Sequence, residues 1–153
     1  MRGKLLALLL ITSPAFSASD IRGFCSGEWP DDDEMFQHCS REQHEAKADF
    51  SALSGEIKDR CAEEWLPDYS MALHCFKEQN TAKRKVSNEP DDEITNYCSS
   101  EWEDDHEMQA HCIKNQRAAK RSIEINFSNA AISECKHEWG IDYEMVEHCL
   151  SEQ

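Results

Sequence analysis

Four segments of the chain carry side chains that could bind a soft metal ion. In each segment a methionine lies three residues before a histidine, and the histidine directly precedes a cysteine. Thioether, imidazole and thiolate groups are ligands for copper and zinc. Copper or zinc sequestration or sensing is therefore one hypothesis for this chain. The Met and His residues concerned are Met35, His38, Met71, His74, Met108, His111, Met145 and His148.

The same residues have a structural interpretation, which we favour. A cysteine held in a disulfide is lost as a thiolate ligand, and methionine fills irregular gaps between packed helices. Each histidine lies at the flank of the expected apolar stripe. In three of the four copies a glutamate follows it one helical turn later, and Asn115 stands there in the third copy. We therefore expect no resident cofactor.

The usual markers of a catalytic centre are absent from the sequence. No nucleotide-binding glycine loop, His-Glu-x-x-His motif, Cys-x-x-Cys pair or haem-attachment motif occurs. Each copy has a Glu and an Asp that could imitate a glycosidase acid pair, but four such pairs at helix turns are more simply caps and solvated faces. We therefore expect no catalytic residues and no enzymatic activity.

These segments belong to a longer unit that occurs four times. The first cysteines of successive units are 36, 37 and 37 residues apart, which is the period of a two-helix repeat. Counted from that cysteine as position 0, a Trp recurs at position 4, an Asp at position 7 and a Gln at position 18. The residues are Trp29, Trp65, Trp102 and Trp139; Asp32, Asp68, Asp105 and Asp142; and Gln43, Gln79, Gln116 and Gln153.

The spacing within a unit predicts two antiparallel helices. In three units an isoleucine lies four residues before the first cysteine, which lies four before the Trp, so these residues share one face of a short first helix. Two loop residues follow, and the recurrent Asp can then accept free N–H groups where a second helix begins. The apolar stripe of that second helix extends to Phe50, Val86 and Ile123, which predicts about 15 to 18 residues.

The two cysteines of each unit lie level with each other across the predicted turn, so their side chains can meet. We therefore predict one disulfide within each hairpin. From Ser19 onward only 19 residues are Leu, Ile, Val or Phe, so the disulfides must replace much of a conventional core. The predicted pairs are Cys25–Cys39, Cys61–Cys75, Cys98–Cys112 and Cys135–Cys149.

The predicted fold is therefore all-α, with four tandem disulfide-stapled αα-hairpins that form a short solenoid or a bundle. The last hairpin has a truncated second helix. The expected segments are a signal peptide over 1–18 and hairpins over 19–50, 51–87, 88–125 and 126–153.

The beginning of the sequence has the features of a secretory signal peptide. Arg2 and Lys4 precede an apolar run over 5–11, and small residues follow at Ala15 and Ser17. The apolar run is too short to span a bilayer. We therefore expect an exported protein without a membrane span, located in the periplasm or outside the cell.

The composition is strongly acidic, with 31 Asp and Glu against 16 Lys and Arg and a formal net charge of −15. Nucleic acids and anionic membranes are poor partners for such a chain. A repeated acidic surface favours a protein or peptide partner of basic character. We therefore expect a non-enzymatic binding or structural protein, and we favour a protein-interaction module. The oligomeric state stays open.

The pattern Cys-x3-Trp-x2-Asp-x2-Met-x3-Cys-x3-Gln resembles a tandem repeat of uncharacterised bacterial proteins. Four copies cover nearly all of the chain after the signal segment. In the repeats it resembles, an aromatic residue precedes the second cysteine, whereas His stands there in this chain. The resemblance implies a tandem repeat and a bacterial source, and it implies no established activity.

Overall fold

The structure is a computed structural model that describes residues 18–152. Within that range all regular structure is α-helical. Residues 1–17 of the predicted signal segment, and the repeated Gln153, lie outside the described residues. The helices are α1 (Ala18–Glu28), α2 (Asp33–Ser51), α3 (Glu56–Trp65), α4 (Tyr69–Ser87), α5 (Glu93–Glu101), α6 (His106–Asn126), α7 (Asn129–Trp139) and α8 (Tyr143–Ser151).

Consecutive helices pair into four hairpins, which we number 1 to 4 along the chain. Each hairpin is closed by the disulfide predicted for it, with Cα–Cα distances of 5.7 to 5.9 Å. The predicted fold of disulfide-stapled hairpins is thus confirmed. The second helices α2, α4 and α6 have 19, 19 and 21 residues, somewhat more than predicted, because no glycine or proline interrupts them. Helix α8 has 9 residues.

The recurrent aspartate begins every second helix. The side chain of Asp32 accepts the N–H groups of Glu34 and Met35 at 3.1 and 3.0 Å. The corresponding aspartates of hairpins 2, 3 and 4 accept the N–H of the methionine three residues later, at 3.1 to 3.2 Å. A helix start leaves these donors without partners inside the helix, so the carboxylate fixes where each second helix begins.

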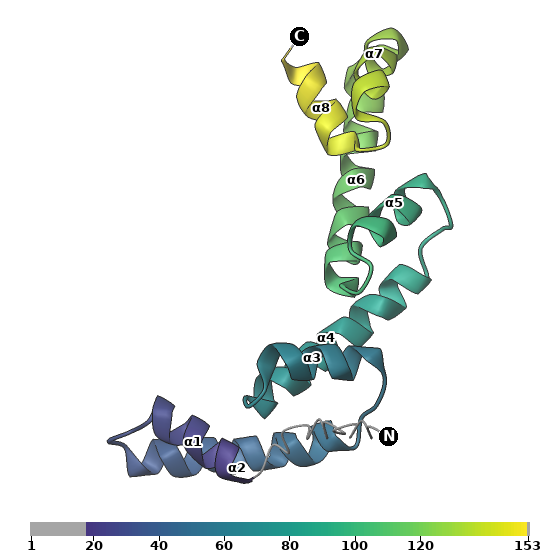
Figure 1. The fold of residues 1–153 in the computed structure, drawn as a ribbon. Coiled ribbons are helices and arrows are strands. Elements are labelled where there is room, and N and C mark those ends of the chain that lie inside the picture. The colour runs from purple at the N-terminus through teal and green to yellow at the C-terminus, as the bar shows by residue number, and fades with distance from the viewer. Residues whose placement is uncertain (1–17, 153) are drawn as a thin grey trace, which may run out of the picture.

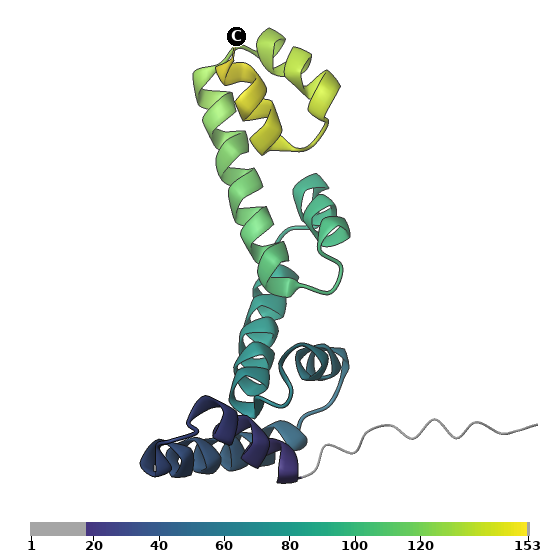
Figure 2. The same ribbon diagram turned by 60° about the vertical axis from the view of Figure 1, so that its left-hand side comes forward.

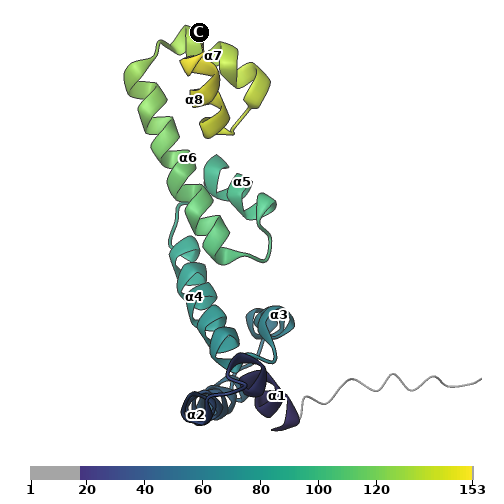
Figure 3. The same cartoon turned by 90° about the vertical axis from the view of Figure 1, so that its left-hand side faces the viewer.

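The hairpins follow one another along an elongated array and do not close into a bundle (Figure 1). Helices α4 and α6 succeed each other along its length, with α1 and α2 at one end and α7 and α8 at the other (Figures 2 and 3). Each second helix packs against the next one, whereas each first helix packs mainly against its own partner. The second helices therefore determine how the hairpins are joined.

The apolar core is divided into two clusters. One lies in hairpins 1 and 2 and includes Ile21, Phe50 and Tyr69. The other lies in hairpins 3 and 4 and includes Ile123 and Val146. The first cysteine of every pair is 0 to 1% exposed, so the disulfides are part of this core. Val86 of α4 packs against the second cluster, so an apolar contact also crosses the junction between hairpins 2 and 3.

Two further observations concern the environment of the chain. No helix within residues 18–152 is both long enough and apolar enough to cross a membrane. The four disulfides are consistent with an extracellular or otherwise oxidising compartment, because most cytosols keep cysteine side chains reduced as thiols.

Candidate functional site

The recurrent glutamine joins each hairpin to the next one. Gln43 donates from Nε2 to Oδ1 of Asp68 at 2.7 Å, and its Oε1 accepts the N–H of Tyr69 at 2.7 Å. Both the donor and the acceptor of the amide are thus bonded to the start of the second helix of the following hairpin. The same two bonds, at 2.6 to 2.9 Å, connect Gln79 with Asp105 and the N–H of His106, and Gln116 with Asp142 and the N–H of Tyr143.

We call this arrangement the Gln–Asp clasp. Its three described glutamines are only 3 to 5% exposed, so the bonds form away from water. A buried amide is costly unless it is hydrogen-bonded, and here both its donor and its acceptor are satisfied. Because the aspartate also caps its own helix, the clasp aligns one second helix with the start of the next.

A lysine and an aromatic ring make a second contact at two of the three junctions. Lys47 Nζ lies 5.1 Å from the ring centre of Tyr69, and Lys120 Nζ lies 5.0 Å from that of Tyr143. The Tyr143 hydroxyl also donates to Glu93 at 2.5 Å and accepts from Lys136 at 3.0 Å. Such cation–π contacts add to the clasp and are worth about 0.5 to 2 kcal/mol each.

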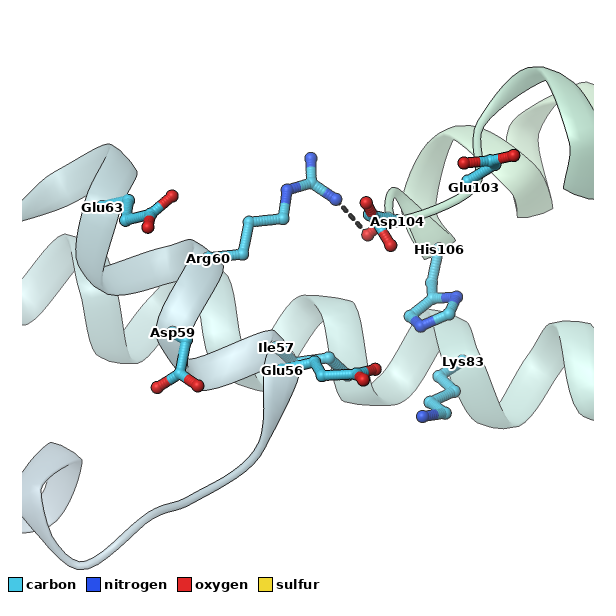
Figure 4. A pocket seen from close by; sticks show the side chains of 9 residues that line it. All are labelled: Glu56, Ile57, Asp59, Arg60, Glu63, Lys83, Glu103, Asp104 and His106. Carbon is cyan, nitrogen blue, oxygen red and sulfur yellow. Dashed lines mark hydrogen bonds between the residues drawn. The ribbon is translucent and has the colours of Figure 1, made fainter.

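The middle junction differs from the other two. His106 occupies the repeat position of Tyr69 and Tyr143, and Lys83 that of the two lysines, and both line a cavity of about 410 Å³ (Figure 4). Five carboxylates line the same cavity, from Glu56, Asp59, Glu63, Glu103 and Asp104.

A groove lies beside the clasp at two junctions. We call the groove between hairpins 2 and 3 the second groove and that between hairpins 3 and 4 the third groove, with volumes of about 140 and about 350 Å³. Both are lined by the same repeat positions. The shared lining is Glu64, Trp65, Met71, His74, Asp105 and Glu107 in the second groove, and Glu101, Trp102, Met108, His111, Asp142 and Glu144 in the third.

The recurrent tryptophans lie at the surface. Trp102 is 41% exposed, and Trp29 and Trp139 are exposed to a similar degree, whereas Trp65 is half-buried. In both grooves the methionine is half-buried and the histidine is exposed. A large aromatic ring open to solvent, repeated beside carboxylates, has the composition of a binding surface.

The residues considered as metal ligands are distributed along the array as one Met–His pair per hairpin. All eight cysteines are in disulfides, so they offer no thiolate. Within residues 18–152 no group of three or more His, Cys, Asp or Glu side chains is placed to hold a metal ion. His38 pairs with Glu42 at 3.3 Å, and His111 lies 3.4 Å from Asn115, each one helical turn away.

Two groove residues that the sequence analysis did not identify control the charge inside the grooves. Arg60 Nη2 pairs with Oδ2 of Asp105 at 2.8 Å, and its Nη1 donates to the carbonyl oxygen of Asp104. The Tyr97 hydroxyl donates to Oδ2 of Asp142 at 3.3 Å. Both residues directly precede the first cysteine of their hairpin. The residue type at this position differs between the units, so recurrence could not reveal it.

The role of the clasp glutamine was also missed, although its recurrence was evident. The spacing places it on the same face of the second helix as the recurrent methionine and the second cysteine. A polar residue that recurs on an apolar stripe is itself a signal, because a buried amide needs a hydrogen-bonding partner. The partner was the recurrent aspartate of the following unit.

The ionisation of these groups differs between the grooves. Burial raises the pKa of Asp105, but hydrogen bonds from Gln79, Arg60 and the Met108 N–H outweigh it, and the pKa lies below its ordinary value. For Tyr97, burial and then the negative charges of the surrounding carboxylates raise the pKa of the phenol. The carboxylates of the third groove thus keep their negative field. In the second groove, Arg60 partly neutralises the corresponding field.

We predict that acid loosens the junction between hairpins 2 and 3. The pKa of Asp105 is lowered from its ordinary value of 3.8, so its charge stabilises the fold above that pH, and the stabilisation is lost as the pH falls through the lower folded value. Hydrogen exchange at the start of α6, corrected for the intrinsic rate, should accelerate below about pH 4.

The variant Asp105→Asn is the matched control, because an asparagine still caps the helix but carries no charge. Its exchange at the start of α6 should depend less on pH than that of the wild type. Equal pH dependence in the two proteins would contradict the assignment.

Comparison with known protein families, with curated proteins and with solved structures finds no match to this chain. The fold and the site therefore define its class: an array of four disulfide-stapled helical hairpins with acidic, tryptophan-lined grooves at two of its junctions.

Proposed function

We propose that this protein is an exported, non-enzymatic repeat protein that binds a basic protein or peptide through the grooves between its hairpins. The main support for this proposal is the third groove, where Trp102 lies exposed beside the carboxylates of Glu101, Asp142 and Glu144. An aromatic face attracts a cation, and carboxylates form charge-assisted hydrogen bonds with it. The net charge of −15 favours encounter with a positively charged partner.

The repetition of the groove supports a partner with several basic residues. The second groove is built from the same repeat positions as the third, one hairpin earlier in the array. An extended partner that places basic side chains in both grooves would bind more tightly than one that uses a single groove, since the second contact is intramolecular. Tandem hairpins are well suited to such extended recognition.

Export is part of this proposal. Positively charged residues followed by an apolar run over 5–11 favour a secretory signal. A protein stabilised by four disulfides is suited to the periplasm or the outside of the cell.

We predict that binding of a basic peptide depends steeply on salt. A peptide of alternating Arg and Gly should lose at least about tenfold in affinity between about 50 and about 500 mM NaCl, because exposed charges are screened. Calorimetry or tryptophan fluorescence measures this effect. The matched control is the same peptide with Glu in place of Arg, which should not bind. Salt-independent binding, or equal binding of the acidic peptide, would contradict the proposal.

A further inference from the structure

We infer that the third groove is a receptor site for an arginine side chain of the partner, and that Arg60 fills the equivalent site of the second groove from within the chain. This inference rests on the proposed function and deepens it. It specifies the chemical group that is recognised and the groove that is free to receive it.

In both grooves the Oδ2 oxygen of the recurrent aspartate faces the groove residue next to the first cysteine, while Oδ1 is used by the clasp. In each, Oδ1 of the recurrent aspartate accepts the clasp glutamine and the N–H of the methionine three residues later. The other oxygen, Oδ2, is turned to the residue that precedes the first cysteine. At Asp105 it accepts a guanidinium N–H of Arg60, and at Asp142 it accepts the hydroxyl of Tyr97.

Arg60 shows how a guanidinium is bound in this setting. One nitrogen bonds the Asp105 carboxylate at 2.8 Å, and the other donates to the carbonyl oxygen of Asp104. The planar fork of arginine suits two acceptors placed side by side, whereas lysine offers a single point charge. The chain therefore contains its own example of arginine recognition by a groove of this construction.

In the described part of the chain, the third groove is lined by carboxylate acceptors and by no lysine or arginine. Among residues 18–152, no ion pair involves Glu101, Asp142 or Glu144. Their donors are neutral: Oδ1 of Asp142 accepts the Gln116 amide at 2.9 Å and the Met145 N–H at 3.2 Å, and Oδ2 accepts the Tyr97 hydroxyl at 3.3 Å. Glu144 accepts the Gln116 amide at 3.4 Å. The volume of the third groove is about 350 Å³, against about 140 Å³ for the second, which Arg60 lines. There is therefore room and unbalanced negative charge for an incoming guanidinium.

The aromatic side chains favour arginine over other cations. Trp102 is 41% exposed and lines the groove together with Tyr97. A guanidinium is weakly hydrated and stacks on an indole face while its edge still donates hydrogen bonds. We therefore expect an arginine to bind more tightly than a lysine in an otherwise identical peptide.

The test is a titration followed by nuclear magnetic resonance. The probe is the blocked pentapeptide Gly-Ser-Arg-Ser-Gly, and the signal is the indole N–H of Trp102. In the wild type this signal should shift on titration. With citrulline in place of arginine, which removes the charge and keeps the shape, affinity should fall at least about tenfold.

Two substitutions at one position separate the inference from a general charge effect. The variant Tyr97→Arg supplies an internal guanidinium, as at Arg60, and should weaken binding at Trp102 by about tenfold. Tyr97→Phe keeps the ring and removes the hydroxyl that bonds Oδ2 of Asp142, so this oxygen is free for the incoming guanidinium and affinity for the arginine peptide should rise. Helical circular dichroism and a thiol assay confirm that each variant is folded and fully oxidised.

The reciprocal variant is Arg60→Tyr, which empties the second groove. The indole N–H of Trp65, silent in the wild type, should then shift with the arginine peptide. If an arginine-rich peptide binds in a salt-dependent way but Trp102 does not respond, or if Tyr97→Arg binds like the wild type, the inference is overturned and the proposed function stands. If no basic peptide binds at all, the proposed function itself fails.

Discussion

Reduction of the four disulfides is expected to abolish most of the helical structure. Each bond closes a loop of about 15 residues and contributes on the order of 3 kcal/mol, or about 12 kcal/mol for four bonds if they are additive. That sum is comparable to the whole net stability of a typical domain. The chain has few large apolar residues to compensate, and the first cysteine of each pair lies in the core.

Far-UV circular dichroism with increasing reductant measures this effect, and a thiol assay reports how many bonds are open. A single staple can be tested with the variant Cys98→Ala/Cys112→Ala, in which protection from hydrogen exchange should fall in α5 while α1 is unaffected. Helicity that survives full reduction would refute the role given to the disulfides.

Replacing Gln79 by leucine is expected to let the two halves of the array move independently. Leucine keeps the size of the side chain but leaves Oδ1 of Asp105 and the N–H of His106 without their partner across the junction. Unsatisfied buried groups cost about 1 to 3 kcal/mol each. The effect should be large here because the buried apolar residues fall into two clusters on either side of this junction, with the half-buried Val86 of α4 as a contact to the second cluster.

Small-angle scattering should show a broader distribution of end-to-end distances for Gln79→Leu, and hydrogen exchange should accelerate at the start of α6. The matched control is Gln37→Leu, at an exposed position of α2, which should leave both measurements unchanged. If the scattering and hydrogen exchange of Gln79→Leu equalled those of the wild type, the clasp would not hold the junction.

The hairpins and their disulfides could be predicted from the sequence because both follow from local spacing. Residues four apart share a helix face, and two cysteines on opposite sides of a short turn lie level. The capping aspartates are local in the same sense, because Asp32 bonds residues only two and three positions later. Over such short sequence separations, covalent and helical geometry determine which side chains can meet.

The junctions could not be predicted in the same way. Gln43 meets Asp68 across 25 residues, and Arg60 meets Asp105 across 45. Such contacts depend on the angle between hairpins, which the spacing within one unit does not determine. The exposure of Trp102 depends on that angle too, because the next hairpin supplies one side of its groove. The charge of each groove depends on one non-recurring residue, Arg60 or Tyr97.

Non-reducing peptide mapping by mass spectrometry tests most directly that every hairpin is locked by its own disulfide. We expect four linked peptide pairs, each joining cysteines 14 positions apart, and no free thiol. Linked peptides from different hairpins, or unpaired cysteines in the native protein, would contradict it.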